Sequence, residues 1–366
     1  MDVLAETKPI NPIEEPVFKN NATHRETSAL AVVKLWKITE PDNPRTTTTT
    51  REMLWPEDRR RHDEKKMSLL EAVRLDGLAL QFCDAYRNDK EVVMAAVRRD
   101  WPALEYASFE LKKDKDVVLA AVLQDARALK YASPELTRDR NFFLEAVREK
   151  GWLLKFAGRT LRADREVVIA AVRQSGWALR FAADKFLGDR GVVLAAVRRC
   201  GQALAYAALR EDKEIVLAAV RDAGTALEYA KNLDREIVLA AVRQNGHALF
   251  HANDKFKSDK EVVLAAVRNH GFSLKYAGAN LKKDKDVALA AVRQDGHALK
   301  YSDLKHDKDV VLAAVEGDSL ALKYATDDLK NDALLLRAAR ATRHRTKFAY
   351  DALKLRSLRL FKSDYY

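Results

Sequence analysis

Apolar and polar positions repeat along most of the chain with a period of 22 to 25 residues. One complete copy, Asp259 to Ala277, reads DKEVVLAAVRNHGFSLKYA. Its Val263, Ala266 and Val267 recur at helical spacing, which indicates a buried face, and its paired alanines let a neighbouring backbone approach closely. After the glycine, Ala-Leu-x-Tyr-Ala is apolar on one side for about two turns. The pattern therefore predicts two helices per unit, the first about ten residues long and the second short.

Each unit opens with an aspartate, and a glycine follows about eleven positions later. Aspartate accepts hydrogen bonds from the amides of a first helical turn, so we expect it to be the N-cap. Glycine suits the left-handed conformation that ends many helices, so we expect it to close the first helix. The aspartates are Asp89, Asp114, Asp139, Asp164, Asp189, Asp212, Asp234, Asp259, Asp284, Asp307 and Asp332, and the glycines are Gly151, Gly176, Gly201, Gly224, Gly246, Gly271 and Gly296.

A two-helix unit of this length cannot bury its apolar face alone, so adjacent units must stack. The sequence predicts an all-α solenoid of about eleven such units, counted from a degenerate first unit near Lys65. We expect the solenoid to span residues 65–332, between an extended N-terminal arm at 1–64 and a basic capping segment at 333–366.

The segment DKDVALAAVRQDGHALKYS, from Asp284 to Ser302, resembles the repeat of domain of unknown function 4116. Two of the present units match one family repeat, and the resemblance covers about residues 65 to 340. It implies a fold of α-helical tandem repeats. The family has no established activity, so the resemblance lends no catalytic residue.

The formal net charge of +11 is not spread evenly. Residues 1–64 hold 10 Lys and Arg against 12 Asp and Glu, residues 65–332 hold 46 against 40, and residues 333–366 hold 9 against 2. The basic tail could bind RNA, acidic lipid or acidic protein, or it could be a solvated cap. Its candidate residues are Arg343, Arg345, Arg356 and Arg359.

Catalytic motifs of the forms GxxxxGK[ST], GxGxxG, GxSxG and HExxH are absent from the sequence. We therefore expect no enzymatic activity and no cofactor. His247 and His251 have the spacing of two metal ligands on a helix, but no third ligand is evident and each falls in a column of the repeat. We therefore predict no metal site.

An arginine closes the first helix in nearly every unit. It could form a basic ladder for a ligand, or it could be a cation at a helix C-terminus that faces an acid of a neighbouring helix N-terminus. We favour the second interpretation. The residues are Arg98, Arg148, Arg173, Arg198, Arg221, Arg243, Arg268 and Arg293.

The position directly after the glycine varies most from unit to unit. Large aromatic side chains there could form a recognition strip, or they could fill gaps between units, and both interpretations stay open. The column consists of Trp152, Trp177, Gln202, Thr225, His247, Phe272 and His297.

Residues 1–64 hold six of the eight prolines, a run of threonines and apolar clusters that contain Trp36 and Trp55. This composition is typical of a flexible arm, and we take both tryptophans as candidates for partner binding.

Cys83 and Cys200 lie five units apart, too far for the ~5.5 Å between Cα atoms that a disulfide needs. The first residues have no pattern of a secretory signal, and the apolar runs are far shorter than the ~20 residues that cross a bilayer. We expect a soluble protein of an intracellular, reducing compartment.

These features favour a non-catalytic scaffold or protein-interaction subunit of a larger assembly. The alternative is RNA or ribosome binding through the basic tail and the repeat surface. The near balance of charges within residues 65–332 weakens the alternative without removing it.

Overall fold

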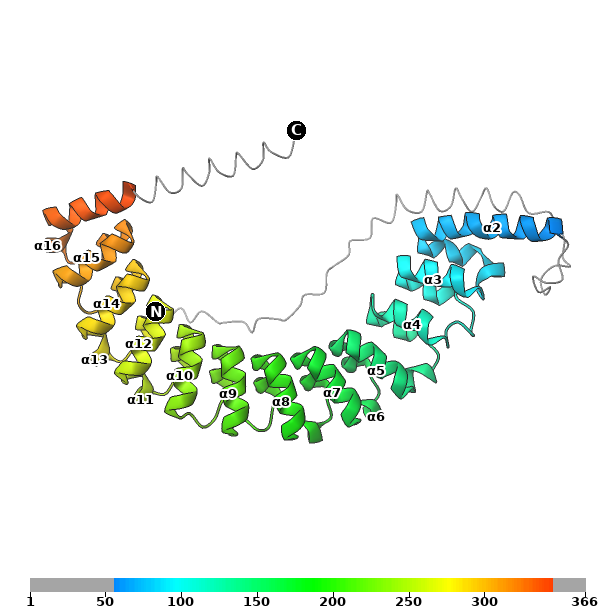
Figure 1. Cartoon of the computed structure of the whole chain (residues 1–366), viewed down its shortest axis with the longest axis horizontal. Helices are drawn as coiled ribbons and strands as arrows, with labels where there is room; N and C mark the ends of the chain where they lie inside the picture. The colour runs from blue at the N-terminus through cyan, green and yellow to red at the C-terminus, as the bar shows by residue number, and fades with distance from the viewer. Residues whose placement is uncertain (1–55, 345–366) are drawn as a thin grey trace, which may run out of the picture. The chain divides into compact units, whose positions relative to one another are not determined.

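The computed structural model describes residues 56–344, and these form a repeated pair of one α-helix and one 3-10 helix (Figure 1). The α-helices of the pairs are α2 (Pro56–Leu75), α3 (Lys90–Arg99), α4 (Lys115–Val122), α5 (Arg140–Glu149), α7 (Arg165–Gln174), α8 (Arg190–Arg199), α9 (Lys213–Asp222), α10 (Arg235–Gln244), α12 (Lys260–Asn269), α14 (Lys285–Gln294) and α15 (Lys308–Gly317). Their 3-10 partners are η2 (Gly77–Phe82), η4 (Trp101–Tyr106), η5 (Ala126–Lys130), η7 (Gly151–Phe156), η8 (Gly176–Phe181), η10 (Gly201–Tyr206), η11 (Gly224–Tyr229), η12 (Gly246–His251), η13 (Gly271–Tyr276), η14 (Gly296–Tyr301) and η15 (Ser319–Tyr324).

Short helical turns lie in several of the connectors between pairs. They are η3 (Asp84–Tyr86), η6 (Leu136–Arg138), α6 (Arg159–Arg162), η9 (Asp184–Phe186), α11 (Asp254–Lys257), α13 (Ala279–Lys282) and α16 (Asp327–Lys330). Residues 333–344 are also helical, and no strand occurs within 56–344. The all-α class and the eleven two-helix units are therefore confirmed for the described part of the chain.

The aspartate caps are confirmed at the start of the long helices. The Asp259 Oδ1 atom accepts hydrogen bonds from the amides of Glu261 at 3.0 Å and Val262 at 3.2 Å. Each bond satisfies a first-turn amide that has no partner within the helix. Most of the long helices are ten residues long, as the spacing predicts.

The glycines do not adopt the left-handed conformation that the sequence suggested. The long helix α7 ends at Ser175, which is extended (φ −142°, ψ 111°), and Gly176 begins the following 3-10 helix. A Cβ atom on Gly176 would lie 2.5 Å from the Ala196 carbonyl oxygen in the next repeat. The glycine is needed because two backbones approach closely there, and the prediction of a left-handed cap is wrong.

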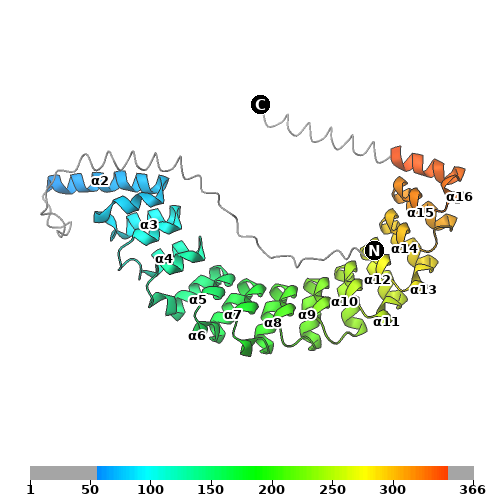
Figure 2. The ribbon, with the colours of Figure 1, turned by 180° about the vertical axis from the view of Figure 1, so that it is seen from behind.

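The chain folds as two compact units, with the boundary between Thr137 and Arg138. In the second unit, each long α-helix packs against the one before and the one after it, from α5 to α15. The six-residue 3-10 helices pack on one another and on the α-helices in the same order. Figures 1 and 2 show these α-helices side by side in chain order, so this unit has an α layer and a 3-10 layer.

The core lies between these two layers. On α7, Val167, Val168, Ala171 and Val172 are fully buried, and Leu179 of the following 3-10 helix is buried with them. The other long helices of the second unit bury apolar side chains at the same positions, so the core of this unit continues from repeat to repeat.

The helix α2 begins at Pro56, within the segment 1–64 that the sequence assigns to the arm. Trp36, Trp55, Arg345, Arg356 and Arg359 lie outside the described residues. Within 56–344, no helix has both the length and the apolar character needed to cross a bilayer.

Candidate functional site

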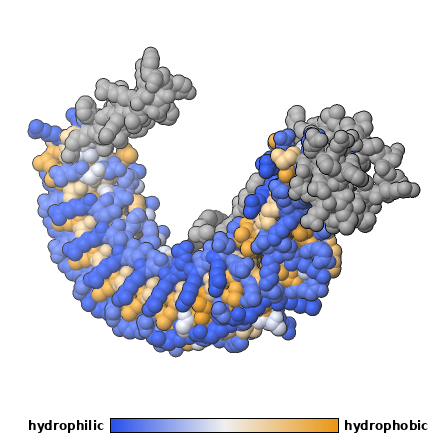
Figure 3. Space-filling view, turned by 45° about the vertical axis from the view of Figure 1, so that its right-hand side comes forward, coloured by the Kyte–Doolittle hydropathy of each residue, from blue (hydrophilic) through white to orange (hydrophobic). Residues whose placement is uncertain are grey.

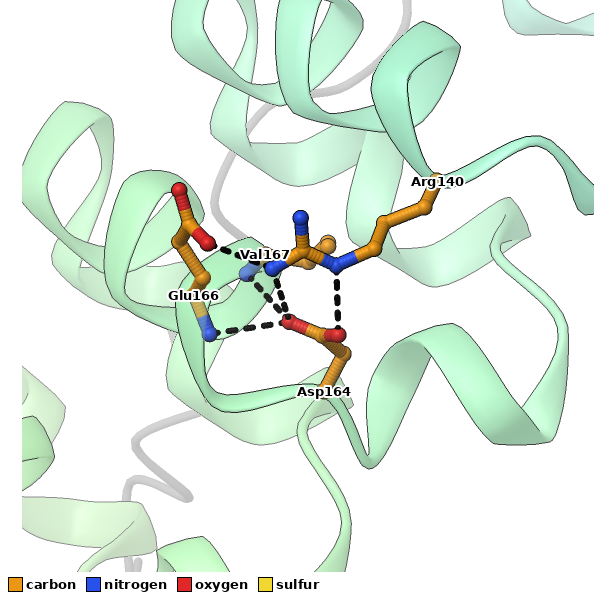
Figure 4. Close-up of polar contacts among 4 residues, drawn as sticks. All are labelled: Arg140, Asp164, Glu166 and Val167. Atoms are coloured by element: carbon orange, nitrogen blue, oxygen red, sulfur yellow. Dashed lines mark hydrogen bonds and ion pairs between the residues drawn. The ribbon is translucent and has the colours of Figure 1, made fainter.

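The cation at the first position of most long helices from α3 to α15 reaches forward to the next repeat, and Lys66 within α2 does the same. On α5, the Arg140 Nε donates to Asp164 Oδ2 at 2.8 Å, and its guanidinium also binds Glu166 (Figure 4). The other oxygen of Asp164 accepts from the amides of Glu166 at 2.9 Å and Val167 at 3.1 Å. The aspartate that begins α7 therefore also joins α7 to α5.

The same ion pair recurs along both units. The pairs are Lys66–Asp89, Lys90–Asp114, Arg165–Asp189, Arg190–Asp212, Lys213–Asp234, Arg235–Asp259, Lys260–Asp284, Lys285–Asp307 and Lys308–Asp332.

These contacts account for the shifted titration of the charged groups. The hydrogen bond from Arg140 lowers the pKa of Asp164 and outweighs burial, which acts in the opposite direction. Hydrogen bonds to Asp234 and Glu236 raise the pKa of Lys213. Shifted pKa values often mark catalytic groups, but here each has a structural cause in a repeated ion pair.

A second repeated contact joins the start of several of the 3-10 helices to the next repeat. The Gly224 amide donates to Gln244 Oε1 at 2.7 Å, and the Gln244 Nε2 donates to the Asp222 carbonyl at 3.0 Å. The residues that accept from such a glycine amide are Gln174, Asp222, Gln244, Asn269 and Gln294, and Asp100 accepts from Gly77 in the first unit. Sequence reasoning missed this contact, although a side chain with an acceptor oxygen two positions before the next glycine was its visible signal.

The arginines in the last turn of the long helices do not pair as we expected. Within residues 56–344, Arg198 contacts Glu214 at 3.6 Å, whereas Arg173, Arg221 and Arg243 are exposed and form no side-chain ion pair. The N-terminus of one long helix lies beside the N-terminus of the next, as the contact between Arg140 and Asp164 demonstrates. Neighbouring acids are therefore at the opposite end of the helix, and first-position cations already hold them.

The variable column lies at the second position of the 3-10 helices and contacts the next repeat. The Trp177 ring packs on Tyr206 with a centroid distance of 5.9 Å, and Phe272 packs on Tyr301 at 5.8 Å. These two variable residues are partly exposed. The structure thus places residues of this column both against a neighbouring repeat and at the surface.

The polar and histidine members of the column lie in the same register. Gln202 Nε2 donates to Thr225 Oγ1 at 2.6 Å, and His297 packs on Tyr324 at a centroid distance of 5.8 Å. Trp152 contacts Phe156 of its own 3-10 helix at 6.0 Å.

The His247 ring packs against His270 of the next repeat in a tilted arrangement, with ring centroids 4.1 Å apart. Burial, and then the neighbouring His270, lower the pKa of His247, and burial lowers that of His251. Within the described range, no group of three or more His, Cys, Asp or Glu side chains could hold a metal ion.

The remaining candidates within the described residues are Arg343 and the two cysteines. Arg343 is exposed near the end of the helix at 333–344, the last described segment. Cys83 and Cys200 are both free thiols, the first buried and the second partly buried.

The sequence model of a family described as "Domain of unknown function (DUF4116)" matches the chain seven times in tandem. One match, residues 139–187, covers the two repeats built on α5 and α7. The segments are 69–112, 89–137, 139–187, 189–233, 234–282, 260–306 and 284–330. No curated protein and no solved structure matches the chain.

Proposed function

Because the chain belongs to the DUF4116 family of tandem repeats, we propose that it is a non-catalytic scaffold that binds protein subunits of a larger assembly. Helical repeats that contact only their neighbours create extended surfaces, and such surfaces are typical of interaction proteins. Asp164 and Lys213, whose pKa values are shifted, join successive repeats, which gives them a structural role.

The variable column carries this proposal. Its residues hold one position in a repeated backbone, yet their side chains change from Trp to Gln, Thr, His and Phe. Trp152, Trp177, Phe272 and His297 are each partly exposed, and His247 is exposed. Large aromatic side chains contribute much of the binding energy in protein interfaces. A protein partner would therefore bind along this column, with different contacts at each repeat.

The double variant Trp152→Gln with Trp177→Gln tests the proposal. Gln202 occupies the same column, so the fold already accommodates glutamine there. We expect affinity purification with quantitative mass spectrometry to recover a partner with the parent chain and to lose it with this variant. The control is Phe109→Ala with Leu334→Ala, which removes two exposed apolar side chains that lie outside the 3-10 helices. Equal recovery by parent and column variant, or equal loss in column variant and control, contradicts the proposal.

RNA or ribosome binding is the alternative function, and the basic composition of residues 333–366 favours it. The repeats themselves weaken it, because acids are interleaved with the cations and most of the first-position cations are held in ion pairs. Salt dependence separates the two functions, as argued in the Discussion.

A further inference from the structure

A column of exposed arginines runs along the α layer of the second unit. Each long helix from α5 to α14 supplies one, in its last turn: Arg148, Arg173, Arg198, Arg221, Arg243, Arg268 and Arg293. Within residues 56–344, Arg198 alone of these seven forms a side-chain ion pair, with Glu214 at 3.6 Å. The column therefore presents positive charge that the described part of the chain leaves largely unneutralised.

On α10 and α12 the acids lie at the N-terminal end of the helix, away from the arginine, whereas on α5 and α9 the acids Glu149 and Asp222 directly follow it. On α12, Glu261 lies seven residues before Arg268, which is about 10 Å along the axis. Glu261 is bound by Arg235, and Glu236 on α10 is bound by Lys213 at 2.7 Å. On α10 and α12, the helix surface is thus neutral at its N-terminal end and basic at its C-terminal end.

Apolar side chains lie between these two ends. On α10, Leu239 and Ala240 line an open depression beside Arg221 of α9 and Arg243 of α10. Figure 3 shows apolar stripes alternating with hydrophilic ones on the face that it presents.

The first unit has a depression in the same register. It lies between α2 and α3 and is lined by Leu70, Arg74, Met94, Ala95 and Arg98. A basic end with an apolar floor is therefore a property of the repeat, present in both units.

From this geometry, we infer that the arginine column from α5 to α14 binds an extended acidic segment of a partner protein. Packed helices lie about 8–10 Å apart, so successive arginines are separated by about that distance. Three residues of an extended or polyproline chain span about 9–10 Å. The segment would carry an acid at about every third position. The aliphatic residues between the acids would contact apolar side chains such as Leu239 and Ala240. The inference rests on the proposed protein-binding function, but it uses a surface separate from the variable column.

A nucleic acid fits this surface less well. Duplex DNA carries a negative charge about every 1.7 Å along its axis, far more densely than one arginine per repeat can neutralise. Arg221, Arg235 and Arg243 line the depression with Leu239 and Ala240, and the side chains of the last two offer no hydrogen-bond donor to a phosphate. A narrow peptide with sparse charges matches both features.

The test measures binding of the full chain to a fluorescein-labelled peptide of repeated Glu-Leu-Pro triplets, by fluorescence anisotropy. The variant Arg221→Gln, Arg243→Gln and Arg268→Gln removes three successive cations of the column. We expect binding to weaken about tenfold, because each exposed ion pair contributes a modest amount to affinity. Circular dichroism should remain that of the parent, since the three side chains are exposed.

The matched control is Lys275→Gln, Lys283→Gln and Lys300→Gln, which removes the same charge from exposed positions outside the column. We expect it to bind the peptide as the parent does. A peptide of the same composition with its glutamates in one block should bind more weakly than the triplet peptide.

Three results would overturn the inference: absence of binding by the parent, equal weakening in the arginine and lysine variants, or tighter binding of a single-stranded oligouridylate through the same arginines. Each leaves the result with the Trp152 and Trp177 variant unaffected, because the peptide assay does not use the natural partner.

Discussion

Arg140 binds Asp164, the residue that begins the next long helix, through an Nε to Oδ2 contact of 2.8 Å. One carboxylate thus both pairs with Arg140 and caps α7, because its other oxygen accepts hydrogen bonds from the first-turn amides of Glu166 and Val167. Helix initiation and the stacking of repeats depend on the same side chain. Loss of that carboxylate would therefore affect local and tertiary structure together.

Asp164→Ala should destabilise the fold by at least about 1 kcal/mol, because first-turn amides of α7 lose their acceptor. The ion pair with Arg140 is lost as well. Urea unfolding followed by circular dichroism should give a lower midpoint than that of the parent. Asp184→Ala is the control, because Asp184 is exposed in a connector and caps no helix with its side chain. Equal midpoints for the Asp164 variant and the parent would mean that the cap is not needed.

The variant Asp164→Asn separates the helix cap from the ion pair with Arg140. Asparagine caps helices about as well as aspartate does, but it removes the negative charge that Arg140 binds. We expect a midpoint between those of the parent and the alanine variant. A value equal to that of the alanine variant would assign the whole effect to the ion pair.

Stability should fall in acid as the capping aspartates take up protons. Hydrogen bonds from Arg140 and Arg235 hold the pKa values of Asp164 and Asp259 below their ordinary range. A lowered pKa in the folded state means that the unfolded chain binds protons more readily. The stability from these groups is therefore fully present above about pH 4 and is lost as the pH falls through the lowered values.

Urea midpoints measured from about pH 7 down to about pH 2 test this dependence. The variant Asp164→Asn with Asp259→Asn should show a shallower decrease than the parent, since two of the titrating groups are gone. If the urea midpoints of parent and variant fall equally steeply with pH, other titrating groups cause the loss of stability in acid.

Gly176→Ala should destabilise the fold by about 1–3 kcal/mol, because the added methyl group overpacks the contact between repeats. Its Cβ would meet the Ala196 carbonyl oxygen at 2.5 Å and the Cys200 Cβ at 2.8 Å. Gly188→Ala is the matched control, since no atom lies within 4 Å of its added Cβ. Thermal melting should distinguish them, and equal melting temperatures would argue against the close approach.

Charge reversal of the tail separates scaffold function from RNA binding. If the chain is a scaffold, a variant with Arg343, Arg345, Arg356 and Arg359 changed to Glu should still bind its protein partner. RNA binding by the parent should then be weak at physiological salt. Tight RNA binding whose logarithm falls with log salt by about 0.7 per neutralised phosphate, and which the variant loses, would favour the alternative.

The sequence by itself determined the all-α class, the repeat period and the start of each long helix from α3 to α15. Each of these depends on residues within about one helix length, such as the cap at Asp259 and the helical spacing of Val263 and Val267. The variable column was also visible, because the repeat aligns its members.

Only the tertiary structure decided how one repeat sits on the next. The long helices stack side by side with their N-termini adjacent. Glu261 therefore forms an ion pair with Arg235 of the preceding repeat, and Arg268 remains exposed. The same stacking brings the backbone of Gly176 against Ala196, so the glycine serves close packing instead of a left-handed turn. A local pattern cannot supply these facts, because the direction and distance between successive helices are set by the packing of buried side chains across the whole interface.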